Sequence, residues 1–132
     1  MSEKYLLMIR DTLNALGIEF LVCVYPYGLQ VSPREWSAGR SYWGFKQDTV
    51  YSMKPQEFLQ RLCESQGIQV INLCTDFIAQ SQSIQPLYFD YNGHWRPAGH
   101  EVAAEGIFRA LKPSLMTWGF HPESLVRYRS RQ

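Results

Sequence analysis

The stretch DYNGHW, positions 90–95, carries the side chains of this chain that are best suited to acid–base chemistry. Histidine ordinarily gains and loses a proton near neutral pH, so His94 is the best single candidate for a general base. Such a base usually needs a carboxylate that fixes its tautomer, and Asp90 precedes it in the same stretch. Gly93 allows a tight turn, yet Asp90 reaches the imidazole only if the chain folds back. The alternative is that Asp90 caps a turn and His94 packs against Trp95.

A second histidine, His100, follows in the next segment and is a weaker candidate. We expect it to lie on a helix and to hydrogen-bond the backbone near the helix start. Asp90, His94 and His100 match the spacing of no common metal site, and the sequence has no close-spaced Cys/His pairs. We therefore expect neither a metal nor a cofactor.

Two helix–glycine–strand units must position these residues. Apolar residues recur at helical spacing over 6–16 and again over 55–65, and each run is followed by a glycine, Gly17 or Gly67, of the kind that ends helices. The segments IEFLVCVY and IQVINL come next and are typical of buried strands. Two such units predict a parallel sheet, which we expect to contain about three strands.

A third unit places the histidine loop on this sheet. TDFIAQSQ predicts a short helix, PLYF an extended segment, and Pro97 the first turn of a helix that ends near Pro113. The small residues Ala103, Ala104 and Gly106 should let that helix lie close to the sheet. In open parallel sheets, chemistry collects where strands end and helices begin, so DYNGHW is predicted at that edge.

The segment from Val31 to Lys54 has no clean period and is rich in Gly, Ser and aromatic residues, which predicts a long ordered loop. Its aromatic side chains either line a binding surface or, as we favour, cover an exposed edge of the core. These side chains are Trp36, Tyr42, Trp43, Phe45 and Tyr51.

Composition excludes several classes of function. The 132 residues are 45% hydrophobic and carry a net charge of +1, which fits one globular domain over 1–132 and favours neither nucleic acid nor a membrane as partner. Three cysteines without paired spacing read as free thiols. With no signal peptide or apolar span at its start, the chain is predicted to be cytoplasmic.

The string LYFDYNGHWRPAGHEVAAEGI resembles the C-terminal catalytic block of the SGNH (GDSL-like) hydrolases, in the branch related to carbohydrate O-acetylation. Members of that branch often read YDGHWNPAGHRLAAEAL, so the match covers G-H-W, P-A-G-H and A-A-E. The similarity extends over residues 5–112, which look like the C-terminal half of the fold, and leaves 113–132 as a tail. It implies a flavodoxin-like three-layer α/β/α fold with a short parallel sheet.

The resemblance also implies site residues. His94 matches the family's catalytic histidine, which activates a serine with the help of an aspartate. Asn92 stands where the family has that aspartate; an amide can orient an imidazole but gives no negative charge, an expected loss of several kcal/mol in the transition state, and Asp90 is the substitute. The family's Gly-Asp-Ser motif is absent, and nothing around Ser32 resembles a nucleophile turn.

Two functions therefore compete, and a general small-molecule-binding α/β domain that uses the aromatic segment is a weaker third. In the first, the domain contributes His94 to Ser-dependent ester hydrolysis or acyl transfer on a small-molecule or carbohydrate ester, once another segment supplies the serine. In the second, it is a non-catalytic interaction module with a degenerate hydrolase fold. Because a half-fold leaves sheet edges and faces uncovered, we expect a homodimer or a partner that supplies the N-terminal segment.

Overall fold

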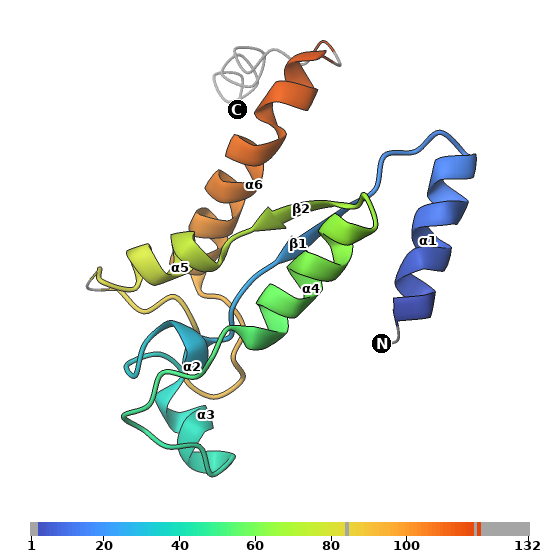
Figure 1. Cartoon of the computed structure of the whole chain (residues 1–132). Helices are drawn as coiled ribbons and strands as arrows, with labels where there is room; N and C mark the ends of the chain where they lie inside the picture. Colours follow the sequence, from blue (N-terminus) through green and yellow to red (C-terminus); the bar gives the residue numbers. More distant parts are fainter. Residues whose placement is uncertain (1–2, 84, 118, 120–132) are drawn as a thin grey trace.

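The structure is a computed structural model that describes residues 3–83, 85–117 and 119. Two short parallel strands lie between helices, and Figure 1 shows the strands at the centre with α4 and α6 beside them. In chain order the elements are α1 (Glu3–Ala15), β1 (Leu21–Val24), α2 (Gly28–Val31), α3 (Ser37–Tyr42), α4 (Lys54–Ser65), β2 (Gln69–Asn72), α5 (Cys74–Gln80) and α6 (Pro97–Thr117).

The sheet is parallel, as the two helix–glycine–strand units predict. Leu21 of β1 pairs with Gln69 of β2, and the register continues to Val24 and Asn72. Within the described residues the sheet has two strands rather than about three. The extended segment PLYF forms a single antiparallel bridge between Tyr88 and Trp95, because its neighbour is its own return strand and not the sheet.

The two faces of the sheet are covered by different helices. Side chains alternate along a strand, so Cys23 and Ile71, which are paired, share one face and pack in the core beneath α5 and α6. On the opposite face the Asn72 amide donates a hydrogen bond of 2.6 Å to Gln60 Oε1 of α4. Helices thus lie on both faces, which gives the three-layer α/β arrangement of the prediction.

Close packing of α6 depends on residues with little or no side chain. A Cβ added at Gly106 would lie 2.5 Å from Leu73 Cδ2, and both Ala103 and Gly106 are buried. The close approach predicted from the small residues is therefore present, although Ala104 points outward and is exposed. Beneath α6 the core is formed by one cluster of buried residues, Val31, Ile71, Leu73, Phe77, Leu87, Tyr88 and Ala103.

The segment from Val31 to Lys54 is not a plain loop, because it contains α3 and begins at the end of α2. Neither helix is long enough to show a period in the sequence. Arg40 holds the segment together: its fully buried guanidinium donates to the backbone oxygens of Glu35 (3.0 Å), Lys46 (3.1 Å), Thr49 (2.7 Å) and Ser32 (2.8 Å). The order of this segment thus comes from a buried cation and from the packing of Phe45 against Trp36 and Tyr51. Tyr42 and Trp43, which we expected to cover the edge of the core, are instead 80% and 65% exposed.

Helix α6 runs past the end predicted for it. Pro113 lies inside the helix, which continues to Thr117. Proline has a helical φ but no N–H, so the helix continues through Pro113 with one backbone hydrogen bond fewer. Ala110 and Leu111, just before it, pack against the core. Of the segment predicted as a tail, residues 118 and 120–132 lie outside the described part of the chain.

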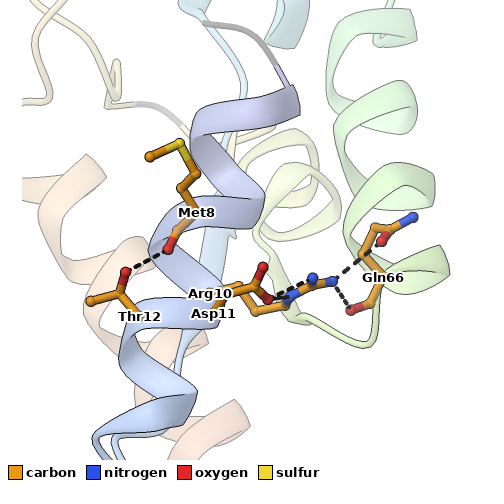
Figure 2. Close-up of polar contacts among 5 residues, drawn as sticks. All are labelled: Met8, Arg10, Asp11, Thr12 and Gln66. Atoms are coloured by element: carbon orange, nitrogen blue, oxygen red, sulfur yellow. Dashed lines mark hydrogen bonds and ion pairs between the residues drawn. The ribbon is translucent and has the colours of Figure 1, made fainter.

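Helix α1 stands at the side of the molecule and has no buried residue (Figure 1). It ends as predicted, with Gly17 at a φ of +67°. Figure 2 shows its polar link to the body, where Arg10 Nη1 donates to the backbone oxygen and to Oε1 of Gln66 at 3.0 and 3.2 Å. In the part of the chain that is described, no helix combines the length and the apolar character needed to cross a bilayer.

Candidate active site

The residues DYNGHW form the turn of a short antiparallel hairpin, which we call the His94 hairpin (residues 87–96). Phe89 N–H donates to the backbone oxygen of His94 and Arg96 N–H donates to that of Leu87, both at 2.8 Å. Gly93 turns the chain with a φ of +68°, a conformation that favours glycine. The glycine thus lets the hairpin close directly before His94.

His94 faces a pocket of about 350 Å³ at the edge of the sheet. The residues that follow β1 form one wall, and His94 itself is exposed to solvent. The imidazole is therefore at the carboxyl end of a parallel strand, where the sequence places it, and is open to a ligand. The lining residues are Tyr25, Pro26, Tyr27, Tyr88, Asn92, Gly93, His94, Trp95 and His100.

The two candidate orienting residues make other contacts. Asn92 Oδ1 accepts a hydrogen bond of 3.0 Å from the backbone N–H of His94, which stabilises the turn. Asp90 Oδ2 lies 4.0 Å from Arg96 Nη2, and its backbone oxygen accepts a hydrogen bond of 2.7 Å from Gly39 N–H. Both residues lie in the same hairpin as His94, but neither side chain is hydrogen-bonded to its imidazole among the described contacts.

His100 lines the same pocket as His94, which the sequence does not indicate. Its ring packs edge-on against Trp95, with 5.5 Å between ring centroids. The backbone N–H of His100 donates to Arg96, but the described contacts include no hydrogen bond from its side chain to the helix start. The imidazole that packs against Trp95 is thus that of His100. The alternative interpretation of the sequence expected this contact from His94.

One buried tyrosine of the pocket lining, Tyr88, has a structural role. The Tyr88 hydroxyl is buried and donates a hydrogen bond of 2.6 Å to the backbone oxygen of Pro26. Burial raises the pKa of Tyr88 well above its ordinary value, so the hydroxyl stays protonated and holds the segment after β1 against the hairpin. Tyr88 is therefore no candidate for proton transfer.

Residues 1–128 match a family model described as the SGNH hydrolase-like domain of the acetyltransferase AlgX. The chain belongs to this family. The match confirms the resemblance to SGNH hydrolases and extends beyond residues 5–112, on which the sequence comparison rested. No curated protein and no solved structure matched the chain significantly.

A glycine that the resemblance includes has a packing reason in this SGNH hydrolase-like domain. A Cβ at Gly99, in the P-A-G-H segment, would lie 2.5 Å from the backbone oxygen of Leu87 and 3.0 Å from Trp95 Cβ. Glycine at this position lets the first turn of α6 approach the His94 hairpin. The motif therefore positions the hairpin as well as contributing His100.

Ser32 of this SGNH hydrolase-like domain does not line the pocket. Its hydroxyl accepts a hydrogen bond of 3.2 Å from the backbone N–H of Arg34. The described residues contain no group of three or more His, Cys, Asp or Glu side chains that could hold a metal ion.

Sequence reasoning missed the pocket residues Tyr25 and Tyr27, because their closeness to His94 arises only from tertiary packing.

Proposed function

We propose that this domain supplies His94 as the general base in Ser-dependent ester hydrolysis or acyl transfer, with an O-acyl carbohydrate as the substrate class. One observation supports this most directly: an exposed imidazole in the family-matched segment lines a pocket at the carboxyl end of β1. A volume of about 350 Å³ is in the range of small-ligand sites and accommodates an acyl group with part of a sugar ring.

The chemistry follows from the position of the imidazole. His94 would take the proton of a serine hydroxyl while the serine oxygen attacks the acyl carbonyl, and would then return the proton to the leaving oxygen. The acyl group first moves to the serine. Its transfer from the serine to water is hydrolysis, and its transfer to a sugar hydroxyl is acyl transfer. The aromatic side chains of Tyr25, Tyr27 and Trp95 offer flat apolar surfaces beside the imidazole for the substrate.

Asp90 is our candidate for the orienting carboxylate. Its contact with Arg96 is long, at 4.0 Å between partly exposed groups, and such a pair contributes little to stability. Asp90 can therefore be recruited by the imidazolium at small cost when charge develops during the reaction. Asn92 supports the site through the turn, by its hydrogen bond to the backbone of His94.

The serine has to come from a segment other than those that line the pocket. None of the described residues that line the pocket is a serine or a cysteine. We propose that a nucleophile-bearing segment docks at this edge of the sheet. It comes from a longer polypeptide, from a second copy or from another chain.

Free thiols at Cys23, Cys63 and Cys74 fit the reducing, cytoplasmic compartment that we propose for the protein.

The decisive experiment compares the natural protein, expressed from its complete gene, with its His94→Ala variant. Hydrolysis of a small aryl acetate and release of acetate from an O-acetylated carbohydrate should both fall by about 10³-fold or more. Thermal unfolding should not change, because the side chain is exposed. Wild-type rates in the His94→Ala variant would refute the proposal.

The alternative function, a non-catalytic interaction module, is favoured by one contact. The amide that stands in the place of the family's aspartate is hydrogen-bonded to the backbone and not to the imidazole. A fluorophosphonate probe separates the two functions, since it labels activated serines. Labelling that depends on His94 would eliminate the interaction module, and absence of labelling and of ester hydrolysis would eliminate the enzyme.

A further inference from the structure

Glu35 has a buried carboxylate directed at the His94 hairpin. The residue is only 3% exposed, although it lies in a polar segment of the sequence. Its Oε1 accepts a hydrogen bond of 2.9 Å from Leu87 N–H and its Oε2 accepts one of 3.1 Å from Tyr88 N–H. Both carboxylate oxygens are thus used by consecutive amides in the first arm of the hairpin.

These contacts suit a carboxylate specifically. An ionised carboxylate only accepts hydrogen bonds, and bonds from N–H donors to a charged acceptor are stronger than neutral ones. Among the described residues no Lys, Arg or His side chain forms an ion pair with Glu35. The nearest guanidinium interaction, from Arg40, goes to the backbone oxygen of Glu35 instead. The two amides are therefore the partners of this carboxylate.

The residues after Glu35 also contact the hairpin. Trp36 Nε1 donates to the backbone oxygen of Tyr91 at 3.3 Å, and Gly39 N–H donates to that of Asp90 at 2.7 Å. Trp36 adopts a φ of +57°, unusual for a bulky residue, and its indole lies where a Cβ of Gly39 would be. Residues 35–39 therefore hold the hairpin at four backbone groups, two of them through Glu35.

We propose that Glu35 is a positioning residue for the His94 pocket. By fixing Leu87 and Tyr88 it also fixes the returning arm, because Arg96 N–H bonds to Leu87 and Phe89 N–H bonds to His94. The direction in which the imidazole enters the pocket is thereby set from residue 35. The effect on catalysis rests on the proposed function, whereas the effect on the geometry of His94 does not.

The test uses Glu35→Gln, with Cys63→Ala as a matched control that removes a fully buried side chain from α4, away from the hairpin. Glutamine keeps the size but presents an NH₂ group to one of the two amides. In Glu35→Gln the hydrogen exchange of the Leu87 and Tyr88 amides should accelerate by about tenfold or more. The NMR signals of the His94 imidazole should shift. In Cys63→Ala both should stay as in wild type.

Activity supplies a separate readout. If the domain is an esterase, Glu35→Gln should lower kcat by about 10- to 100-fold and leave KM within about twofold, because the imidazole is misplaced while the pocket walls remain. Glu35→Asp, which keeps the charge, should recover part of kcat. If the His94 signal shifts in Glu35→Gln but the protein hydrolyses no ester, the positioning role is supported and the proposed function is contradicted.

Two results would overturn the positioning role. One is wild-type amide exchange and an unshifted His94 signal in Glu35→Gln. The other is an equal shift in Glu35→Gln and Cys63→Ala, which would show general loosening. Should Glu35→Gln fail to fold, Glu35→Asp takes its place: a displaced His94 signal supports the role, and an unchanged signal with unchanged Leu87 and Tyr88 exchange contradicts it.

Discussion

Asn92 and His94 are joined through the backbone of one turn, with Asn92 Oδ1 accepting a hydrogen bond of 3.0 Å from the His94 N–H. The residue that the resemblance aligns with the family's aspartate thus shapes the chain that carries the imidazole, and the described contacts include no hydrogen bond between the two side chains. Asn92 therefore stabilises the turn but brings no negative charge to it.

Asn92→Asp should therefore increase activity. Aspartate can accept the same hydrogen bond from the His94 N–H, and it adds a charge that would stabilise the imidazolium of the proposed reaction. We expect kcat for an aryl acetate to rise by about tenfold, with little change in the unfolding temperature. Asn92→Ala, which loses both the turn contact and the charge, is the comparison; equal rates in wild type and Asn92→Asp would show that this position does not act on the imidazole.

Arg40 should be among the most sensitive positions for stability. Its guanidinium is fully buried and donates to four backbone oxygens, and Arg40→Lys replaces a planar group that has five donors by a single ammonium. We expect a loss of about 2–4 kcal/mol in the free energy of unfolding, measured by urea denaturation. Arg109→Lys is the control: Arg109 forms an ion pair with Asp76 on the surface, and this substitution should cost less than about 1 kcal/mol.

Gly106→Ala should destabilise the contact between α6 and the residues after β2. The added methyl group meets Leu73 Cδ2 at 2.5 Å in a core where Leu73 is fully buried. Overpacking of this kind costs about 1–3 kcal/mol, although alanine is the better helix former. Ala104→Ser, two residues away on the exposed side of α6, should change the free energy of unfolding by less than about 0.5 kcal/mol, and a similar small change in Gly106→Ala would contradict the packing argument.

Cys74 should make the stability depend on pH in the alkaline range. Burial is the main cause that raises the pKa of Cys74 from 9.0 to about 11, so the folded protein keeps the proton after the unfolded chain has lost it. The stabilisation is fully present below pH 9.0 and is lost as the pH rises through about 11. The difference in unfolding free energy between wild type and Cys74→Ala should shrink across this window, and a constant difference would show that the thiol titrates normally.

Sequence patterns predicted the elements that have strong local signals. Helices α1 and α4 show a helical period, and two residues after each of them comes a glycine with positive φ, Gly17 or Gly67. Strand β2 coincides with an apolar run. Helices α2 and α3 were not predicted, because they are too short to show a period. The contacts that Arg40 of α3 makes with the backbone of Lys46 and Thr49 leave no periodic signal in the sequence.

The candidate site was predicted in part. The edge on which His94 lies follows from the order of strands and helices, so its position was accessible from the sequence. Glu35 was not, because an acidic residue in a polar segment normally faces water, and nothing local indicates that its partners are the amides of Leu87 and Tyr88. The pocket wall formed by Tyr25 and Tyr27 escaped prediction for the same reason.

The hydrogen bond between Glu35 and Leu87 spans 52 residues along the chain. Such distant contacts form slowly, because the intervening chain must first give up the entropy of an open loop. During synthesis on the ribosome, α1, β1 and α2 emerge long before the hairpin that Glu35 holds. The pocket around His94 should therefore be among the last parts of the molecule to assemble, and newly made chains should acquire their overall shape before they can bind a ligand.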